Sequence, residues 1–285
     1  MTILQKTKAM IQLVRPELPA AAGICVVVGQ VIALRGLPTF SAAVMGFLLG
    51  LFLSSSAMVF NDYFDLEVDR INAPYRPLPS GLLSQFEVIA FGAITAVIAL
   101  AIALVIHPLV FGLSLVTWIL GFLYNWKLKA AGLWGNLIVS TSVAMTFILG
   151  GISVGQAANP MLWIFGLIGF FFDLAEEIAG DAMDMEGDAK RASRSLAIIH
   201  GKRTALRISS LLFSVVIVLT IVPILCGETG AGYWIPIAVM DGLIIFFTVK
   251  LVKSQTSHEG RSWMRRLYLS ATLGLIAFVF SRFIG

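Results

Sequence analysis

The stretch SAAVMGFLLGLFLSSSAMVF, residues 41–60, decides the fold, and it runs directly into NDYFDLEVDRIN, residues 61–72. The first part is twenty residues long and carries no charge, which is what an α-helix needs to cross the hydrocarbon core of a bilayer. The second part holds four acidic side chains and two amides. We therefore predict a membrane-spanning helix with a dense acidic cluster at one end.

The composition of the 285 residues is that of a polytopic membrane protein. Hydrophobic residues make up 58% of the chain, charged residues make up 13%, and the mean hydropathy is +0.92. One water-soluble core cannot bury that much apolar surface. Cys25 and Cys226 both lie in apolar runs, which favours packing roles over a disulfide or a metal pair. We expect the lipid bilayer as the surroundings of the chain and no nucleic-acid partner.

Apolar runs bounded by charges, or by Pro and Gly clusters, predict an all-α membrane bundle of about nine transmembrane helices. An amphipathic lead-in at the membrane interface is expected before the first span, over residues 1–15. The predicted spans are 18–34, 41–60, 86–106, 109–124, 133–152, 160–180, 205–226, 232–252 and 264–284.

The basic residues of the chain are unevenly divided between the two sides of this arrangement. If successive spans alternate in direction, all of the 20 Lys and Arg except Arg35 and Arg282 fall on the side of the N-terminus. By the positive-inside rule, that side is cytoplasmic. We therefore predict a multi-pass protein of the cell membrane whose N-terminus and charged loops face the cytoplasm.

Most of the acidic residues gather in two clusters that flank the second and the sixth predicted spans. The first cluster is Asp62, Asp65, Glu67, Asp69 and Glu87, and the second is Asp173, Glu176, Glu177, Asp181, Asp184, Glu186 and Asp188. Both lie at predicted cytoplasmic helix ends, so they can face each other across one cavity. The offset of four spans also predicts four-helix repeats near 18–130 and 133–260 inside a single domain, 1–285.

Helical geometry arranges the acids of each cluster in a stripe, if the helices continue through them. The first stripe covers about 100° of helix surface and the second about 60°. The first consists of Asn61, Asp62, Asp65 and Asp69, and the second of Glu177, Asp181, Asp184 and Asp188. Carboxylates this close repel one another and need a cation. A ligand set of oxygen atoms without His or Cys favours Mg²⁺, which completes its shell with water and phosphate oxygens. The alternative is a solvated face on which the acids pair with the local bases Arg70, Arg76, Lys190, Arg191 and Arg194.

Basic residues lie in three predicted cytoplasmic loops that could converge on a diphosphate. They are Arg76 in YRPLPSG, Lys127 and Lys129 in YNWKLK, and Lys190 and Arg194 in GDAKRASRS. The positive-inside rule accounts equally well for bases at these places. A prenyl diphosphate is the diphosphate that suits a bilayer, because its hydrocarbon tail can lie between helices while its head group stays at the rim.

These motifs resemble those of the UbiA-type intramembrane prenyltransferase family, and the resemblance covers essentially the whole chain. Residues 61–81, NDYFDLEVDRINAPYRPLPSG, are similar to its first aspartate-rich motif, and residues 181–188, DAMDMEGD, are similar to its second. The second motif is closest to that of digeranylgeranylglyceryl phosphate synthase-like members, and YNWKLK resembles the loop signature between the motifs. The resemblance implies a nine-helix bundle around a central lipid-open cavity, a Mg²⁺-bound prenyl diphosphate and transfer to a lipophilic acceptor.

The resemblance also implies roles for individual residues. The expected metal ligands are Asn61, Asp62, Asp65, Asp69, Asp181, Asp184 and Asp188. Among these, the expected catalytic residues are Asp62, Asp65, Asp69, Asp184 and Asp188. The expected substrate-binding residues are Asn61, Arg76, Tyr124, Lys129, Lys190 and Arg194. In the implied chemistry, Mg²⁺ and bases stabilise the leaving diphosphate, the allylic C–O bond breaks, and the acceptor captures the cation.

The acceptor stays open at this point. Transfer of geranylgeranyl to geranylgeranylglyceryl phosphate is our first hypothesis, and quinone precursors and chlorins are the alternatives. Enzymes that transfer geranylgeranyl to geranylgeranylglyceryl phosphate usually carry Arg-Glu where this chain has Glu176 and Glu177. A membrane terpene cyclase of the same family would ionise the same diphosphate. A cation-coupled secondary transporter is the rival of another class, although its acids should lie near the midplane, where this chain has only Asp241.

Overall fold

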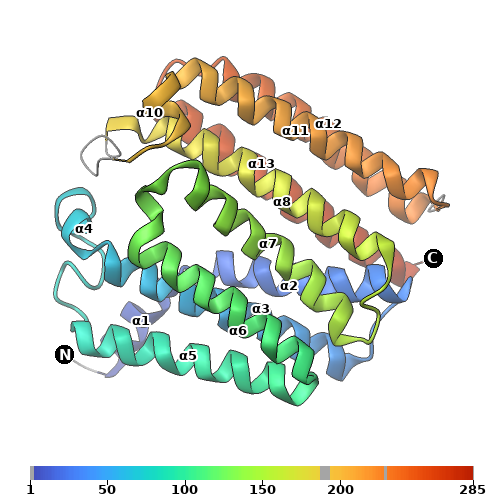
Figure 1. Cartoon of the computed structure of the whole chain (residues 1–285), viewed down its shortest axis with the longest axis horizontal. Coiled ribbons are helices and arrows are strands. Elements are labelled where there is room, and N and C mark those ends of the chain that lie inside the picture. The colour runs from blue at the N-terminus through green and yellow to red at the C-terminus, as the bar shows by residue number, and fades with distance from the viewer. Residues whose placement is uncertain (1–2, 187–192, 228–229, 285) are drawn as a thin grey trace.

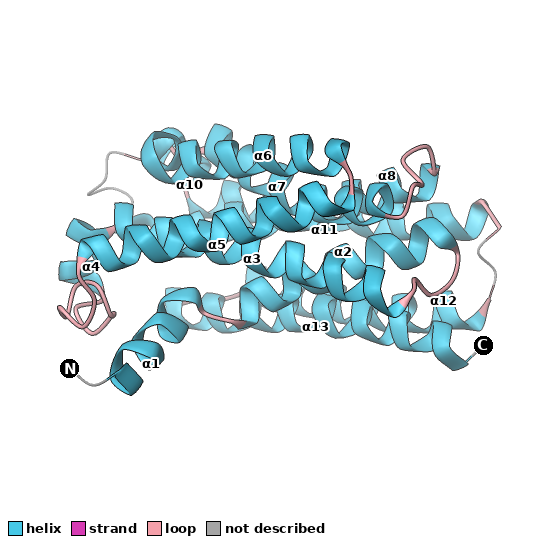
Figure 2. Cartoon of the chain, turned by 90° about the horizontal axis from the view of Figure 1, so that it is seen from below, coloured by secondary structure: helices cyan, strands magenta, loops and turns pink. Residues whose placement is uncertain are grey.

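The computed structural model describes residues 3–186, 193–227 and 230–284, and every regular element in these residues is a helix (Figure 2). Nine long helices in this part of the chain pack side by side in a bundle (Figure 1). They are α2 (Glu17–Leu34), α3 (Phe40–Phe64), α5 (Gln85–Ile106), α6 (Pro108–Leu123), α7 (Leu133–Ser153), α8 (Pro160–Met183), α11 (Lys202–Leu225), α12 (Ala231–Val252) and α13 (Ser257–Ile284). The prediction of an all-α bundle of about nine helices is confirmed.

Eight of the nine helices are long and apolar enough to cross a membrane, and for α6 the span includes the helical turns that follow it, up to Ala131. The exception is α8, which has 24 residues but carries four acids of the second cluster in its last eleven positions. The helix that is too charged for an ordinary span is therefore one of the two that carry the acidic clusters. Figures 1 and 2 place the two ends of the chain at opposite ends of the bundle, as an odd number of crossings requires.

Shorter elements gather at one end of the bundle. They are α1 (Ile3–Val14), α4 (Leu66–Asn72), the π-helix η1 (Tyr124–Leu128), the 3₁₀-helix η2 (Lys129–Ala131) and α10 (Leu196–His200). Figure 1 shows α1, α4 and α10 together at the end where the N-terminus lies. This is also the end at which α3 and α8 finish, so both acidic clusters are carried to the same end of the molecule.

Polar caps set the starts of the long helices close to the predicted positions. The Thr39 side chain accepts a hydrogen bond from the backbone N–H of Ala42 at the start of α3. Ser84 and Glu87 form a reciprocal capping box at the start of α5. At its other end, α3 runs four residues beyond the predicted span and stops at Phe64, and α4 begins after the single residue Asp65. The first acidic cluster is therefore helical on both sides of one break.

Glycines allow α2 and α7 to approach closely at the centre of the bundle. A Cβ at Gly29 would lie 2.1 Å from the carbonyl oxygen of Phe147, and a Cβ at Gly150 would lie 2.1 Å from that of Val26. Small residues at such crossings let helix backbones pack tightly within a membrane, where no hydrophobic effect drives association.

The predicted four-helix repeat and the predicted central cavity stay predictions.

A small apolar cluster packs α1 against the end of the bundle. Ala9 and Leu13 of α1 are buried against Val59 of α3 and Val88 of α5. Lys6 of α1 also forms an ion pair with Glu87 at the start of α5. This packing fixes the chain just before Arg15, which is the first residue after α1 and part of the site described below.

Candidate active site

The first acidic motif lies where α3 ends and α4 begins. Asp62 is in the last turn of α3 and is only 2% exposed, Asp65 lies at the break, and Asp69 is in α4. The backbone N–H of Asp65 donates to the backbone carbonyl of Asn61 at 3.0 Å, and the N–H of Asp69 donates to the carbonyl of Asp65 at 2.8 Å. Because this pattern continues the helical turn across the break, successive carboxylates keep the spacing that the predicted stripe required.

Two guanidinium groups neutralise the first motif. Nη1 of Arg76 lies 2.6 Å from Oδ2 of Asp69 and 3.5 Å from Oδ1 of Asp62. Arg15 forms a second ion pair with Asp62. Partial burial opposes the charge of Arg76, but its hydrogen bond with Asp69 and the carboxylate of Asp62 outweigh burial and raise the pKa of the guanidinium. The buried Asp62 carboxylate is thus held between two bases from different parts of the chain.

Lys129 connects the segment after α6 to the first motif. Its Nζ donates to Oδ1 of Asn61 at 2.8 Å and lies 2.5 Å from Oδ2 of Asp65. The segment leading to it is η1, a π-helical turn, and such turns occur often at functional sites. Within η1, the side-chain amide of Asn125 donates to the carbonyl of Ala57 in α3 at 3.1 Å. The π-helix is therefore tied to α3 beside the first motif.

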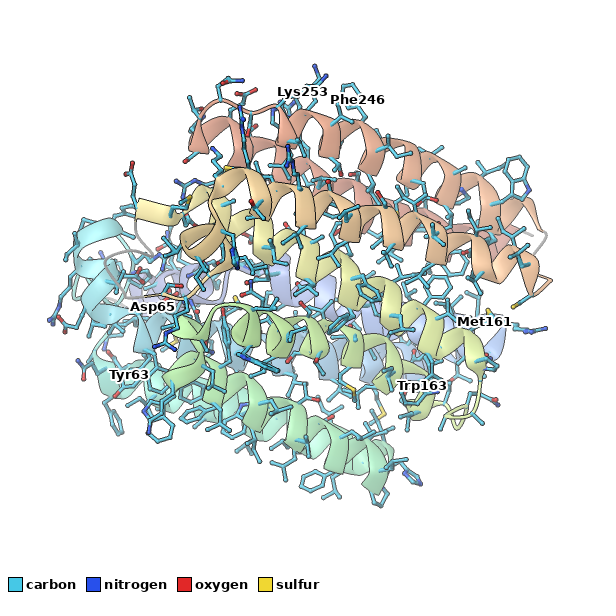
Figure 3. The ribbon with its side chains drawn as sticks, turned by 45° about the horizontal axis from the view of Figure 1, so that its top comes forward. Tyr63, Asp65, Met161, Trp163, Phe246 and Lys253 are labelled. Carbon is cyan, nitrogen blue, oxygen red and sulfur yellow. The ribbon has the colours of Figure 1, made fainter. Side chains whose placement is uncertain are left out.

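The second acidic motif lies at the end of α8. Figure 3 shows Met161 and Trp163, near the start of α8, at the opposite end of the bundle from Asp65. The helix then runs back to the acidic end, where Asn136 of α7 donates to Oδ2 of Asp181 at 2.9 Å. Ser140, one turn after Asn136 on α7, donates to Oδ2 of Asp173, two turns before Asp181 on α8, at 2.9 Å.

The predicted second stripe extends beyond the last residue of α8. The α-helix ends at Met183, so Asp184 is a C-cap residue rather than a member of the helix, and it pairs with Arg261 of α13 at 2.5 Å. The backbone N–H of Asp184 still donates to the carbonyl of Gly180 at 3.0 Å, so the helical turn reaches this residue. The prediction that Glu177, Asp181, Asp184 and Asp188 form one stripe stays a prediction. Asp188 and Lys190 lie outside the described residues.

The two motifs approach each other through Lys129 and Tyr124. Lys129, which binds the first motif, also lies within electrostatic range of Glu177 in α8. Tyr124 lies within the same kind of range of Asp65 and of Asp181. These two residues of the YNWKLK segment are therefore close to both acidic clusters.

A backbone contact joins the segment after the second motif to the same place. The N–H of Arg194 donates to the carbonyl of Ala130 at 3.1 Å, while the Arg194 side chain is exposed. Gly132 has a φ of +62°, and a Cβ there would lie 2.0 Å from the carbonyl oxygen of Arg194. Only glycine suits this contact, which holds the chain after the second motif against η2.

The oxygen-rich side chains are of the kind that Mg²⁺ prefers, but they are paired with bases in this structure. Within residues 3–186, 193–227 and 230–284, no three His, Cys, Asp or Glu side chains lie close enough together to hold an ion. The carboxylates of Asp62, Asp65, Asp69 and Asp184 instead contact arginine or lysine. The carboxylate and amide oxygens suit a divalent cation, and such a cation would have to displace these bases.

Sequence reasoning missed several residues that contact the acids. They are Arg15, Asn136, Ser140 and Arg261. Arg15 and Arg261 were counted only as charges on the predicted cytoplasmic side. Their places at the ends of the first and last spans, on the side of both motifs, are the signal that could have identified them.

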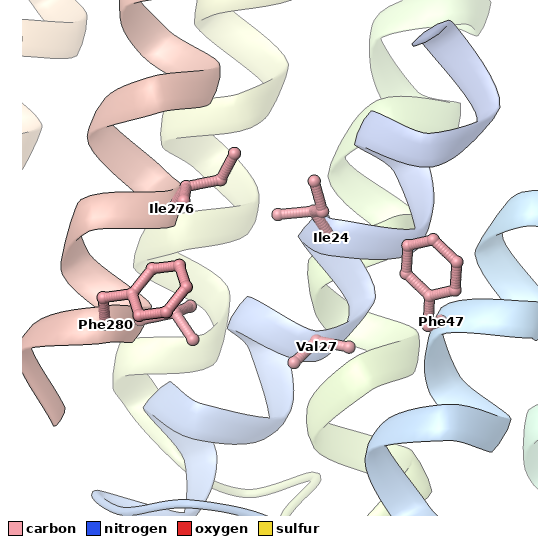
Figure 4. Close-up of a pocket in the computed structure, with 6 residues that line it drawn as sticks. Ile24, Val27, Phe47, Ile276 and Phe280 are labelled. Carbon is pink, nitrogen blue, oxygen red and sulfur yellow. The ribbon is translucent and has the colours of Figure 1, made fainter. Parts of the chain in front are cut away.

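An apolar crevice lies away from the acids, between α2, α3 and α13 (Figure 4). It has a volume of about 340 Å³ and is lined by Ile24, Val27, Phe47, Ile276, Val279 and Phe280. No charged group lines it. The crevice can accommodate hydrocarbon but offers nothing for bond cleavage.

The family model of the UbiA prenyltransferases matches residues 22–273, and the chain belongs to this family. It is a multi-pass membrane prenyltransferase. Two similar proteins are the digeranylgeranylglyceryl phosphate synthases of Thermococcus gammatolerans and Methanopyrus kandleri. The first is 32% identical over 96% of this chain and 97% of its own length, and the second is 33% identical over 96% and 99%.

Solved structures share the fold. One described in connection with digeranylgeranylglyceryl phosphate synthase in membranes has a TM-score of 0.77 at 28% identity and covers 98% of this chain and 99% of its own. The UbiA homologue of Aeropyrum pernix has a TM-score of 0.78 at 20% identity, with 95% and 98% covered. That of Archaeoglobus fulgidus, solved with DMAPP and Mg²⁺, has a TM-score of 0.69 at 20% identity, with 97% and 99% covered.

Proposed function

We propose that this protein transfers a prenyl group from a prenyl diphosphate to a lipophilic acceptor in a Mg²⁺-dependent reaction. The observation that carries the proposal is the position of Lys129, which contacts Asn61 and Asp65 and also lies within range of Glu177. One base between two acidic clusters at the end of an apolar bundle suits a diphosphate head group with a hydrocarbon tail.

The metal ligands in this proposal are Asn61, Asp62, Asp65 and Asp69 from the first motif, with Asp181, Asp184 and Asp188 from the second. Mg²⁺, when bound, neutralises the charge that develops on the leaving diphosphate. The bases that now pair with the carboxylates then become free to bind phosphate oxygens, and they include Arg15, Arg76 and Lys129. Lys190, Arg194 and Tyr124 are further candidates for contacts with the head group.

The proposed acceptor is geranylgeranylglyceryl phosphate, with a geranylgeranyl group transferred to it. The support is that relatives named digeranylgeranylglyceryl phosphate synthase align with nearly the whole of this chain at about one third identity. The apolar crevice beside α2 and α13 supports a long-chain lipid as a ligand, because its lining is entirely hydrocarbon and aromatic.

The proposed orientation places the acidic end of the bundle in the cytoplasm. Lys6, Arg15, Arg76, Lys129 and Arg261 all belong to this end, in agreement with the positive-inside rule. A soluble diphosphate donor made in the cytoplasm would then reach the site without crossing the membrane.

The test is a turnover assay with purified protein in detergent, radiolabelled geranylgeranyl diphosphate and Mg²⁺. Geranylgeranylglyceryl phosphate, a hydroxybenzoate, a naphthoate quinone precursor and a chlorophyllide are offered separately, each with an EDTA control. We expect a metal-dependent product with geranylgeranylglyceryl phosphate alone. A product with another acceptor would overturn the acceptor assignment, and hydrocarbon release without any acceptor would identify a cyclase. No diphosphate release from donors of any length would contradict the proposal as a whole.

A further inference from the structure

Asp184 makes a contact that the scheme above does not use. Its Oδ1 lies 2.5 Å from Nη1 of Arg261, the fifth residue of α13. The two side chains are 52% and 59% exposed, so this ion pair lies at the open edge of the site. Arg261 is therefore a cation next to the second motif that comes from neither aspartate-rich motif nor from the segment between them.

The first turn of α13 is fixed independently of this ion pair. The backbone N–H of Glu259 donates to Oγ1 of Thr256 at 3.1 Å, and Oε2 of Glu259 accepts from the N–H of Gln255 at 3.0 Å. Gly260 packs so closely on Met183 that a Cβ would lie 2.2 Å from its sulfur. Since Met183 ends α8, this packing keeps Arg261 beside Asp184 whether or not the two are paired.

A metal ion bound at Asp184 would compete directly with Arg261. Exposed ion pairs are weak, so a divalent cation can displace the guanidinium at little cost. The displaced group stays close by, because Gly260 packs against the Met183 side chain and holds the start of α13 beside the end of α8. The planar guanidinium of Arg261 would be well suited to bind the phosphate oxygens of a metal-bound substrate in bidentate fashion.

We propose that Arg261 is a further substrate-binding residue of this enzyme. It neutralises Asp184 in the substrate-free protein and moves onto a phosphate group of the substrate when a divalent cation takes Asp184. This inference rests on the proposed function. Both substrates of that reaction carry a phosphate group, the donor as a diphosphate and the acceptor as a phosphate ester, and the experiment distinguishes them.

The first arm measures Mn²⁺ binding to the purified, substrate-free protein by electron paramagnetic resonance of the free ion. We expect Arg261→Gln to bind Mn²⁺ about two- to fivefold more tightly than the unmodified protein, because the competing cation is gone. Arg203→Gln is the matched control, since Arg203 is exposed on α11 and forms no ion pair within the described residues. Equal Mn²⁺ affinity in Arg261→Gln and the unmodified protein would overturn the counter-ion role.

The second arm measures two quantities in Mg²⁺, the affinity for a thiolo-diphosphate analogue of the donor and the KM for geranylgeranylglyceryl phosphate. We expect one of them to weaken about tenfold or more in Arg261→Gln, with partial recovery in Arg261→Lys, and whichever weakens identifies the phosphate. If neither weakens, the substrate-binding role is overturned. A protein that shows the change in Mn²⁺ affinity but transfers no prenyl group would contradict the proposed function and leave the counter-ion role standing.

Discussion

The Asp62 carboxylate is the most enclosed charge of the first motif, and both Arg15 and Arg76 face it. Asp62→Asn keeps the shape of the side chain but removes the charge that a metal and two bases share. We expect prenyl transfer to fall at least about 100-fold, as when a group that stabilises developing charge is removed. Initial rates with the preferred acceptor measure this, and an unchanged elution profile in detergent shows that the bundle is intact. A rate within about tenfold of the unmodified enzyme would remove Asp62 from the metal site.

Arg15 supplies the second residue-scale prediction. It adopts a φ of 51° between α1 and α2, a costly conformation for a residue other than glycine, and strain of this kind is often found at functional sites. We expect Arg15→Gln to weaken donor binding about tenfold, because a charge-assisted contact to phosphate is lost. Lys8→Gln is the control, since Lys8 is exposed on α1. Equal donor affinity in both variants would show that Arg15 only balances the charge of Asp62.

Spacing along the chain was enough to predict which residues of the first motif lie close together, but it could not predict their distant partners. Asn61, Asp65 and Lys129 meet as expected, because one helix end and one loop lie on the same predicted side. Arg15 and Arg261 lie 47 and 77 positions from the carboxylates that they contact. Such contacts depend on how helices pack, and hydropathy carries no information about that.

At the scale of elements, apolar runs and the charges or Pro and Gly clusters that bound them predicted where helices form but not where their geometry changes. The break at Asp65 and the π-helical turn of η1 both interrupt helical pattern without Pro or Gly to mark them. Each is stabilised by a tertiary contact, such as the hydrogen bond from Asn125 to the carbonyl of Ala57.

The π-helical turn gives a prediction of its own. Asn125→Leu removes the hydrogen bond that ties η1 to α3 and leaves the carbonyl of Ala57 without that partner. We expect Lys129 to lose its position beside Asp65 and turnover to fall about tenfold or more, while the bundle stays folded. Steady-state rates and thermal unfolding in detergent measure the two effects. A loss of thermal stability with unchanged turnover of the remaining folded enzyme would show that the turn is only structural.

The crossing of α2 and α7 gives a prediction about stability. Gly150→Ala places a methyl group 2.1 Å from the carbonyl oxygen of Val26, so the helices must move apart. We expect a loss of about 1–3 kcal/mol in the free energy of unfolding, the usual cost of overpacking, measured by denaturant titration in mixed micelles. Gly112→Ala is the control, because nothing lies within 4 Å of a Cβ there. An equal effect of the two substitutions would mean that the crossing is not tightly packed.

At the scale of the whole molecule, the distribution of charge predicted the odd number of spans. All but two of the basic residues fall on the same side if nine spans alternate, and a missed span would scramble this division. The charges therefore check the number of spans independently of hydropathy. The same distribution placed both acidic clusters at one end, which agrees with α3 and α8 both finishing there. Which helices are neighbours was not predictable, because the lipid-facing and protein-facing sides of uniformly apolar helices have similar composition.

The central claim is that the two acidic motifs form one site for a metal-bound diphosphate. Its most direct test is the binding of a non-reactive thiolo-diphosphate donor analogue, with and without Mn²⁺, to the unmodified protein and to Asp62→Asn and Asp184→Asn. We predict tight binding only with the metal, and loss of that metal-dependent binding in each variant, because each motif supplies part of the same site. Donor binding that needs no metal, or that either variant retains at full affinity, would contradict the claim.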